Sequence, residues 1–82
     1  MSYVILHACS YFNCDYFIDL EKNGNKFVVL VWNKAKRRTE RRIEYCQMAP
    51  ARRMFDKLCN AYGMTTVKEV EPEWFDLCAC AD

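Results

Sequence analysis

Residues 15–33 read DYFIDLEKNGNKFVVLVWN, and this stretch decides the fold class. Asn23 and Gly24 stand between two runs that are rich in β-branched and aromatic residues. Both central residues of a tight hairpin turn must accept positive φ, so this pair is the strongest short-range signal for a β-hairpin. The second run, residues 26–33, is apolar at both odd and even positions, which is typical of a strand covered on both faces. The stretch therefore predicts a hairpin whose second strand lies in the middle of a sheet.

Three other segments favour strands. Residues 41–46 alternate between polar and apolar side chains and predict a third strand, preceded by a basic loop at residues 34–40. Residues 64–70 predict a fourth strand, which Pro72 would end. Residues 3–9 are apolar enough to form another strand or to continue the first strand of the hairpin. If residues 3–9 continue the first strand of the hairpin, the sheet has three strands, or four when residues 64–70 are included.

One helix is predicted between the third and fourth strands. From Ala51 to Tyr62, apolar residues recur at offsets of 0, 3, 4, 7, 8 and 11, the spacing of a single helix face. Pro50 suits the first helical turn, where its missing N–H is not needed. Gly63 stands where a left-handed C-terminal cap is expected. This apolar face should pack on the sheet.

Length and composition suggest one α+β domain over residues 1–82, with a small antiparallel sheet in the order β-β-β-α-β and one amphipathic helix packed on one face. The chain is 52% hydrophobic and 15% aromatic, which can supply a core at this length. Its apolar runs are far shorter than the roughly 20 residues of a membrane helix. No basic segment precedes an apolar stretch at the N-terminus. We therefore expect a cytoplasmic protein without a membrane partner. If a phage encodes the protein, the cytoplasm is that of the host cell.

The charges are unevenly distributed although the net charge is only +1. Positions 34–53 carry eight Lys or Arg and two Glu, a local balance of +6, whereas positions 64–82 have a balance of −4. The candidate partner-binding residues are Lys34, Lys36, Arg37, Arg38, Arg41, Arg42, Arg52 and Arg53. Such a cluster attracts phosphates, and its guanidinium groups pair equally well with carboxylates. It could also be a solvated hairpin tip that keeps strands of different molecules apart. Aromatic residues for base stacking are missing inside the stretch.

The cysteines and the histidine give little sign of chemistry. The chain has six cysteines: Cys9, Cys14, Cys46, Cys59, Cys78 and Cys80. We expect Cys46 and Cys59 to be small buried residues. A zinc site from the other four, or with His7 replacing one thiolate, would require the chain ends to meet and lacks Cys-x-x-Cys spacing. Free thiols, no metal and no cofactor are the expectation.

An enzyme is not indicated. His7 is the only histidine and lies in an apolar stretch, and both glycines are explained by the turn and the cap. The aromatic residues exceed what so small a core easily buries, so some must lie near the surface. Trp74 and Phe75 are expected to cover the sheet face opposite the helix, while Tyr11 and Phe12 have no predicted place.

Surplus aromatics, divided charge and no catalytic set are typical of a small protein-binding module or inhibitor. Phages and other mobile elements encode such blockers of host nucleic-acid-handling complexes, anti-CRISPR proteins among them. We therefore expect a macromolecular partner, either a protein or a protein–nucleic acid complex. The alternatives are a direct DNA- or RNA-binding domain using the basic hairpin at residues 34–42, a zinc-stapled structural module, and a homodimer formed through the sheet face. The near-neutral net charge ranks protein binding first.

Overall fold

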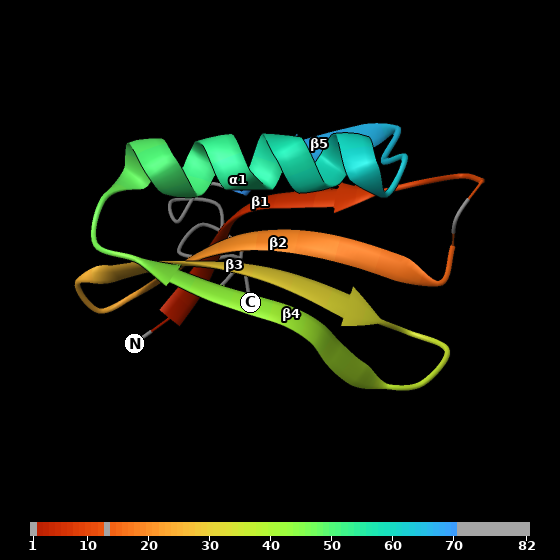
Figure 1. The fold of residues 1–82 in the computed structure, drawn as a ribbon, viewed down its shortest axis with the longest axis horizontal. Helices are drawn as coiled ribbons and strands as arrows, with labels where there is room; N and C mark the ends of the chain where they lie inside the picture. The colour runs from red at the N-terminus through yellow and green to blue at the C-terminus, as the bar shows by residue number, and fades with distance from the viewer. Residues whose placement is uncertain (1, 13, 71–82) are drawn as a thin grey trace, which may run out of the picture.

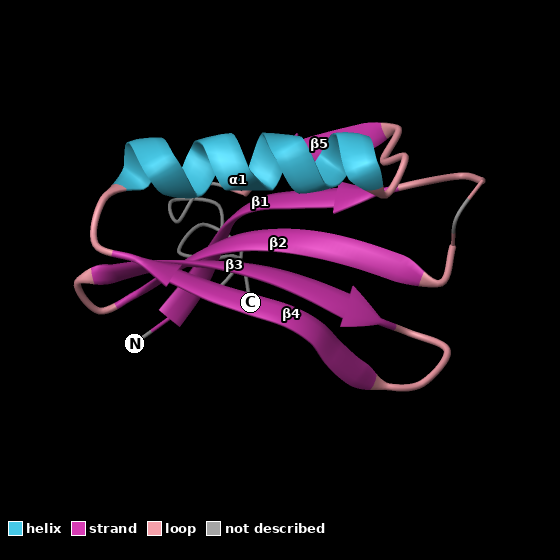
Figure 2. Cartoon of the chain, in the orientation of Figure 1, coloured by secondary structure: helices cyan, strands magenta, loops and turns pink. Residues whose placement is uncertain are grey.

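The computed structural model describes residues 2–12 and 14–70 (Figure 1). Along the chain they form β1 (Ser2–Cys9), β2 (Tyr16–Asn23), β3 (Lys26–Asn33), β4 (Arg38–Tyr45), α1 (Met48–Ala61) and β5 (Thr66–Glu69). The strands make one antiparallel sheet in the order β4-β3-β2-β1-β5. The helix lies along one face of this sheet (Figure 2). The predicted α+β class with an antiparallel sheet is confirmed.

Residues 2–12 and 14–70 form a sheet of five strands, so the prediction of three or four was wrong. The difference comes from β1, which does not continue the first strand of the hairpin. It lies between β2 and β5, with Leu6 opposite Leu20 on one side and Glu69 on the other. The observed order is therefore β-β-β-β-α-β. An apolar segment such as β1 is stabilised by a place inside the sheet, where both of its edges are paired.

The predicted hairpin of β2 and β3 forms, but the two central residues of its turn are Gly24 and Asn25 and not Asn23 and Gly24. Gly24 has a φ of 62°, and Asn23 pairs with Lys26 across the turn. Val28, Val29 and Val31 of β3 are all buried, which agrees with the apolar pattern on both faces of this strand. All of residues 26–33 pair with β2 on one side, and residues 27–33 pair with β4 on the other.

Strand β4 begins earlier than the alternating pattern indicated. It runs from Arg38, so the predicted basic loop at residues 34–40 is shortened to a turn at residues 34–37. The side chain of Asn33, only 3% exposed, explains this closure. Its Oδ1 accepts the backbone N–H of Lys36 at 3.0 Å, and its Nδ2 donates to Glu40 Oε1 at 2.8 Å. These bonds bring the start of β4 against the end of β3, as Asx side chains often do in turns.

The helix packs its predicted stripe on the sheet. Phe55 is fully buried and Met54 is half-buried at the margin of the core. The core joins the helix residues Ala51, Phe55, Leu58 and Cys59 to the sheet residues Leu6, Ala8, Ile18, Leu20, Val29 and Val31. Gly63 has a φ of 66°. Its N–H donates to Asn60 O at 3.3 Å, and the N–H of Met64 donates to Cys59 O at 2.8 Å. These two bonds form a Schellman cap, which confirms the predicted end of the helix.

The opposite face of the sheet carries a row of rings. The His7 and Phe17 ring centroids lie 5.2 Å apart, and those of Phe17 and Trp32 lie 6.3 Å apart. The predicted cover of this face by Trp74 and Phe75 lies outside the described residues. In the part of the chain that is described, no helix has the length and apolar character needed to cross a membrane.

Candidate partner-binding surface

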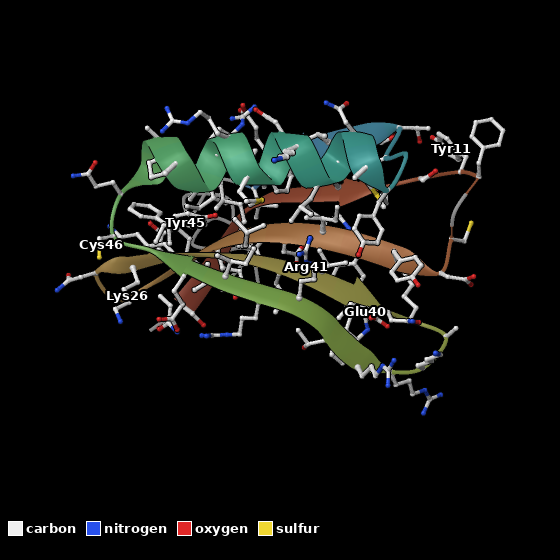
Figure 3. All side chains as sticks on the ribbon, viewed as in Figure 1. Tyr11, Lys26, Glu40, Arg41, Tyr45 and Cys46 are labelled. Carbon is white, nitrogen blue, oxygen red and sulfur yellow. The ribbon has the colours of Figure 1, made fainter. Side chains whose placement is uncertain are left out.

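Two chain reversals meet at one end of the sheet. One is the β3–β4 turn at residues 34–37, and the other is the β1–β2 loop, of which residues 10–12, 14 and 15 are described. The backbone N–H of Lys34 donates to Asp15 O at 2.7 Å and joins the two segments. Figure 3 shows Tyr11 and Glu40 toward this end, and Lys26, Tyr45 and Cys46 toward the other.

The β3–β4 turn presents three cations to solvent. Lys34, Lys36 and Arg37 are exposed, and none of them forms an ion pair with another described residue. Lys34 Nζ lies 5.9 Å from the centroid of the Phe17 ring, within the range of a cation–π contact. Arg37 has a φ of 53°, in the left-handed region. No other non-glycine residue among those described has a positive φ. The turn is therefore an accessible centre of positive charge.

The cations on β4 are partly neutralised. Arg38 Nε lies 3.4 Å from Glu40 Oε1, and Arg42 Nη1 lies 2.6 Å from Glu44 Oε1. The hydrogen bond from Asn33, assisted by Arg38, holds the pKa of Glu40 below its usual value. Hydrogen bonds from Arg42 and then Lys26 lower the pKa of Glu44 in the same way. These carboxylates stay ionised, and their negative charge partly neutralises the arginines beside them.

The other candidate cations lie away from the turn. Arg41 pairs with Val31, so it projects on the helix-covered face of the sheet, unlike Arg42. Arg52 and Arg53 are exposed on the early part of α1, which begins at the end of the sheet where β4 finishes (Figure 1). Arg52 Nε lies 3.3 Å from Asp56 Oδ1 in an exposed pair of the kind that contributes little to stability. The eight predicted residues thus do not form one cluster.

The β1–β2 loop adds two aromatic residues that sequence reasoning left without a place. Tyr11 is 81% exposed and Phe12 is 92% exposed. The sequence did contain one signal for their exposure: two adjacent aromatic residues between two strands, in a segment without helical or strand periodicity. Such a signal cannot show what lies beside the loop, because the neighbouring turn is more than twenty residues away in the sequence.

The thiols lie in different environments. Cys59 is buried as predicted, and burial together with the charge of Asp56 raises its pKa to about 11. Cys46 is exposed just beyond the end of β4, so its predicted burial was wrong. Cys9 and Cys14 are free thiols. Cys14 Sγ donates to Ser10 O at 3.6 Å and Tyr11 O at 3.5 Å.

The described residues alone do not form a metal site. Across residues 2–12 and 14–70, no group of three or more His, Cys, Asp or Glu side chains is placed to hold a metal ion. The predicted zinc alternative also uses Cys78 and Cys80, which lie outside the described residues. It stays a prediction.

The fold and this surface define a small α+β domain that displays a cationic turn and an exposed aromatic loop at the same end of its sheet. Comparisons with protein-family models, with curated proteins and with solved structures found no match to the chain.

Proposed function

We propose that this protein is a small non-enzymatic binding module whose β3–β4 turn contacts a carboxylate-bearing surface of a protein partner. Binding of this kind would allow it to act as a stoichiometric inhibitor, for example of a host nucleic-acid-handling complex. The eight-residue cation set named from the sequence is narrowed in this proposal to Lys34, Lys36 and Arg37, with the paired arginines of β4 beside them.

The observation that carries the proposal is that Arg37, an exposed arginine, occupies a left-handed backbone position in the turn. A left-handed backbone costs an L-residue about 1 kcal/mol, and glycine would adopt it freely. Arginine at this position therefore brings no benefit to the turn itself. Its exposed guanidinium, without a carboxylate partner among the described residues, is free to form the forked hydrogen bonds that this group makes with carboxylates.

Direct nucleic-acid binding is a second candidate, and one observation favours it. Tyr11 and Phe12 lie at the same end as the basic turn and could supply the base stacking that is missing within the basic stretch. A single-strand binder also needs a continuous positive path along the phosphates. Here Glu40 and Glu44 alternate with the arginines of β4, which interrupts that path.

Site-specific photocrosslinking tests the proposal. Lys36 is replaced by the photoreactive p-benzoylphenylalanine in the full chain, which is expressed and irradiated in the cells where the protein is naturally made. The matched control carries the same group at Lys57, an exposed cation on α1. We expect a protein adduct of defined mass from position 36 and none from position 57, because only the turn faces the partner.

The other outcomes distinguish the candidates. If nucleases remove the adduct, the partner at the turn is a nucleic acid and not a protein. Equal adduct patterns from positions 36 and 57, or no adduct at position 36, would contradict a binding role for the turn.

A further inference from the structure

We infer that Tyr11 and Phe12 form the apolar part of the same partner-binding surface, and that the partner is a protein with an apolar pocket bordered by carboxylates. The inference rests on the proposed binding role of the β3–β4 turn. It adds two residues and a partner chemistry that the basic segment alone does not indicate.

The two aromatics contribute little to the fold. The rings of Phe17 and Trp32 pack against each other on the sheet, and the Tyr16 and Tyr62 rings contact each other with centroids 5.2 Å apart. By contrast, Phe12 is 92% exposed, so its ring gains almost none of the free energy that burial gives to an aromatic side chain.

The start of the loop, which carries these rings, is held by hydrogen bonds within the loop and to Thr65. The N–H of Tyr11 donates to Thr65 Oγ1 at 3.2 Å, and the N–H of Phe12 donates to Ser10 Oγ at 3.1 Å. The N–H of Thr65 donates to Cys9 O at 2.9 Å, which fastens the start of the loop to the segment after α1. A fixed backbone displays the two rings with less conformational entropy left to lose on binding.

The loop and the turn together have the composition of an interface centre. The bond from Lys34 N–H to Asp15 O extends the pairing of β2 and β3 by one residue, so the loop and the turn leave the sheet at the same end. Aromatic and arginine side chains dominate the binding energy of protein interfaces when they fill pockets on the partner. Charged side chains around them favour a partner of opposite charge and speed its association. An apolar pocket with carboxylates at its border matches this arrangement.

The experiment begins with the partner identified by the adduct from position 36. Its dissociation constant is measured for the unaltered chain, for Tyr11→Ser combined with Phe12→Ser, and for Phe12→Ser alone. The matched control is Val67→Ser, which removes an apolar side chain that is 47% exposed on the edge strand β5. We expect the double substitution to weaken binding roughly tenfold or more and the control to leave it unchanged.

Thermal unfolding of each variant shows whether it keeps its fold, and exposed positions should change little. If the partner binds the loop variants as tightly as the unaltered chain, the inference is wrong while the role of the turn stands. If position 36 gives no adduct, the proposed function itself fails. An adduct at position 36 with a nucleic acid overturns the protein partner.

Discussion

His7 and Asp19 show how a single pair of side chains is placed by the register of two strands. They lie directly opposite each other on β1 and β2, with His7 Nδ1 2.5 Å from Asp19 Oδ1. Burial raises the pKa of Asp19 above its ordinary range, and the hydrogen bond and charge of His7 only partly offset this effect. Glu21 on the same strand also has a raised pKa, because of burial and the nearby charge of Asp19.

The raised pKa of Asp19 predicts the direction in which the free energy of unfolding changes with pH. A carboxyl that binds its proton more tightly in the folded state adds stability below its unfolded pKa, and this stability is lost as the pH rises through the folded pKa. In Asp19→Asn the position no longer titrates, but the amide oxygen still accepts a hydrogen bond from His7. We expect the unaltered chain to gain free energy of unfolding relative to this variant as the pH falls from neutral to about 4. Urea unfolding across this range measures the difference, and parallel pH curves for the two proteins would refute the assignment.

At the scale of the element, α1 is the part of the structure that the local sequence specifies most completely. Its apolar stripe, first-turn proline and cap glycine all follow from local sequence, and the helix forms where they indicate. The β3–β4 turn is less local, because Asn33 closes it through contacts with Lys36 and Glu40. The periodicity of residues 41–46 could not reveal these contacts, and this is why the predicted strand began too late.

Among the described residues, Phe55 is the largest fully buried side chain, and it lies in the middle of the helix stripe. Phe55→Ala removes the ring and leaves a cavity, so we expect the free energy of unfolding to fall by about 3–5 kcal/mol. That loss approaches the whole stability of many small domains. Chemical denaturation measures it, with Lys57→Ala on the exposed face of the same helix as the control. Equal stabilities of the two variants would mean that the helix packs through another face.

At the scale of the whole molecule, the structure distributes the basic residues over distinct places. Arg52 and Arg53 lie on the early part of α1, Arg41 lies on the helix-covered face, and the turn cations lie at the end where the β1–β2 loop reverses. The predicted homodimer through the sheet face remains a prediction.

A salt series tests the molecule as a nucleic-acid binder. Labelled duplex DNA and single-stranded RNA are titrated with the reduced full chain at increasing salt. With a net charge of +1 and carboxylates between the arginines of β4, we expect weak binding that does not saturate at physiological salt. Binding to duplex DNA with a log–log slope of about −0.9 for each of four or more phosphates would contradict this expectation. The Lys34→Ala, Lys36→Ala, Arg37→Ala triple variant would then show whether the turn makes those contacts.

The sequence by itself determined the α+β class, the Asn-Gly hairpin, the buried strand β3 and the helix with its cap. These features depend on side-chain periodicity and on backbone preferences within a few residues, and both can be read from neighbouring positions. It also showed that positions 34–53 are basic. Only the tertiary structure decided that β1 is a separate inner strand, that the cations fall into separate groups, and that Tyr11 and Phe12 stand at the same end as the turn. Those facts depend on which strands pair and in which register, and such long-range pairing is set by the packing of the whole sheet.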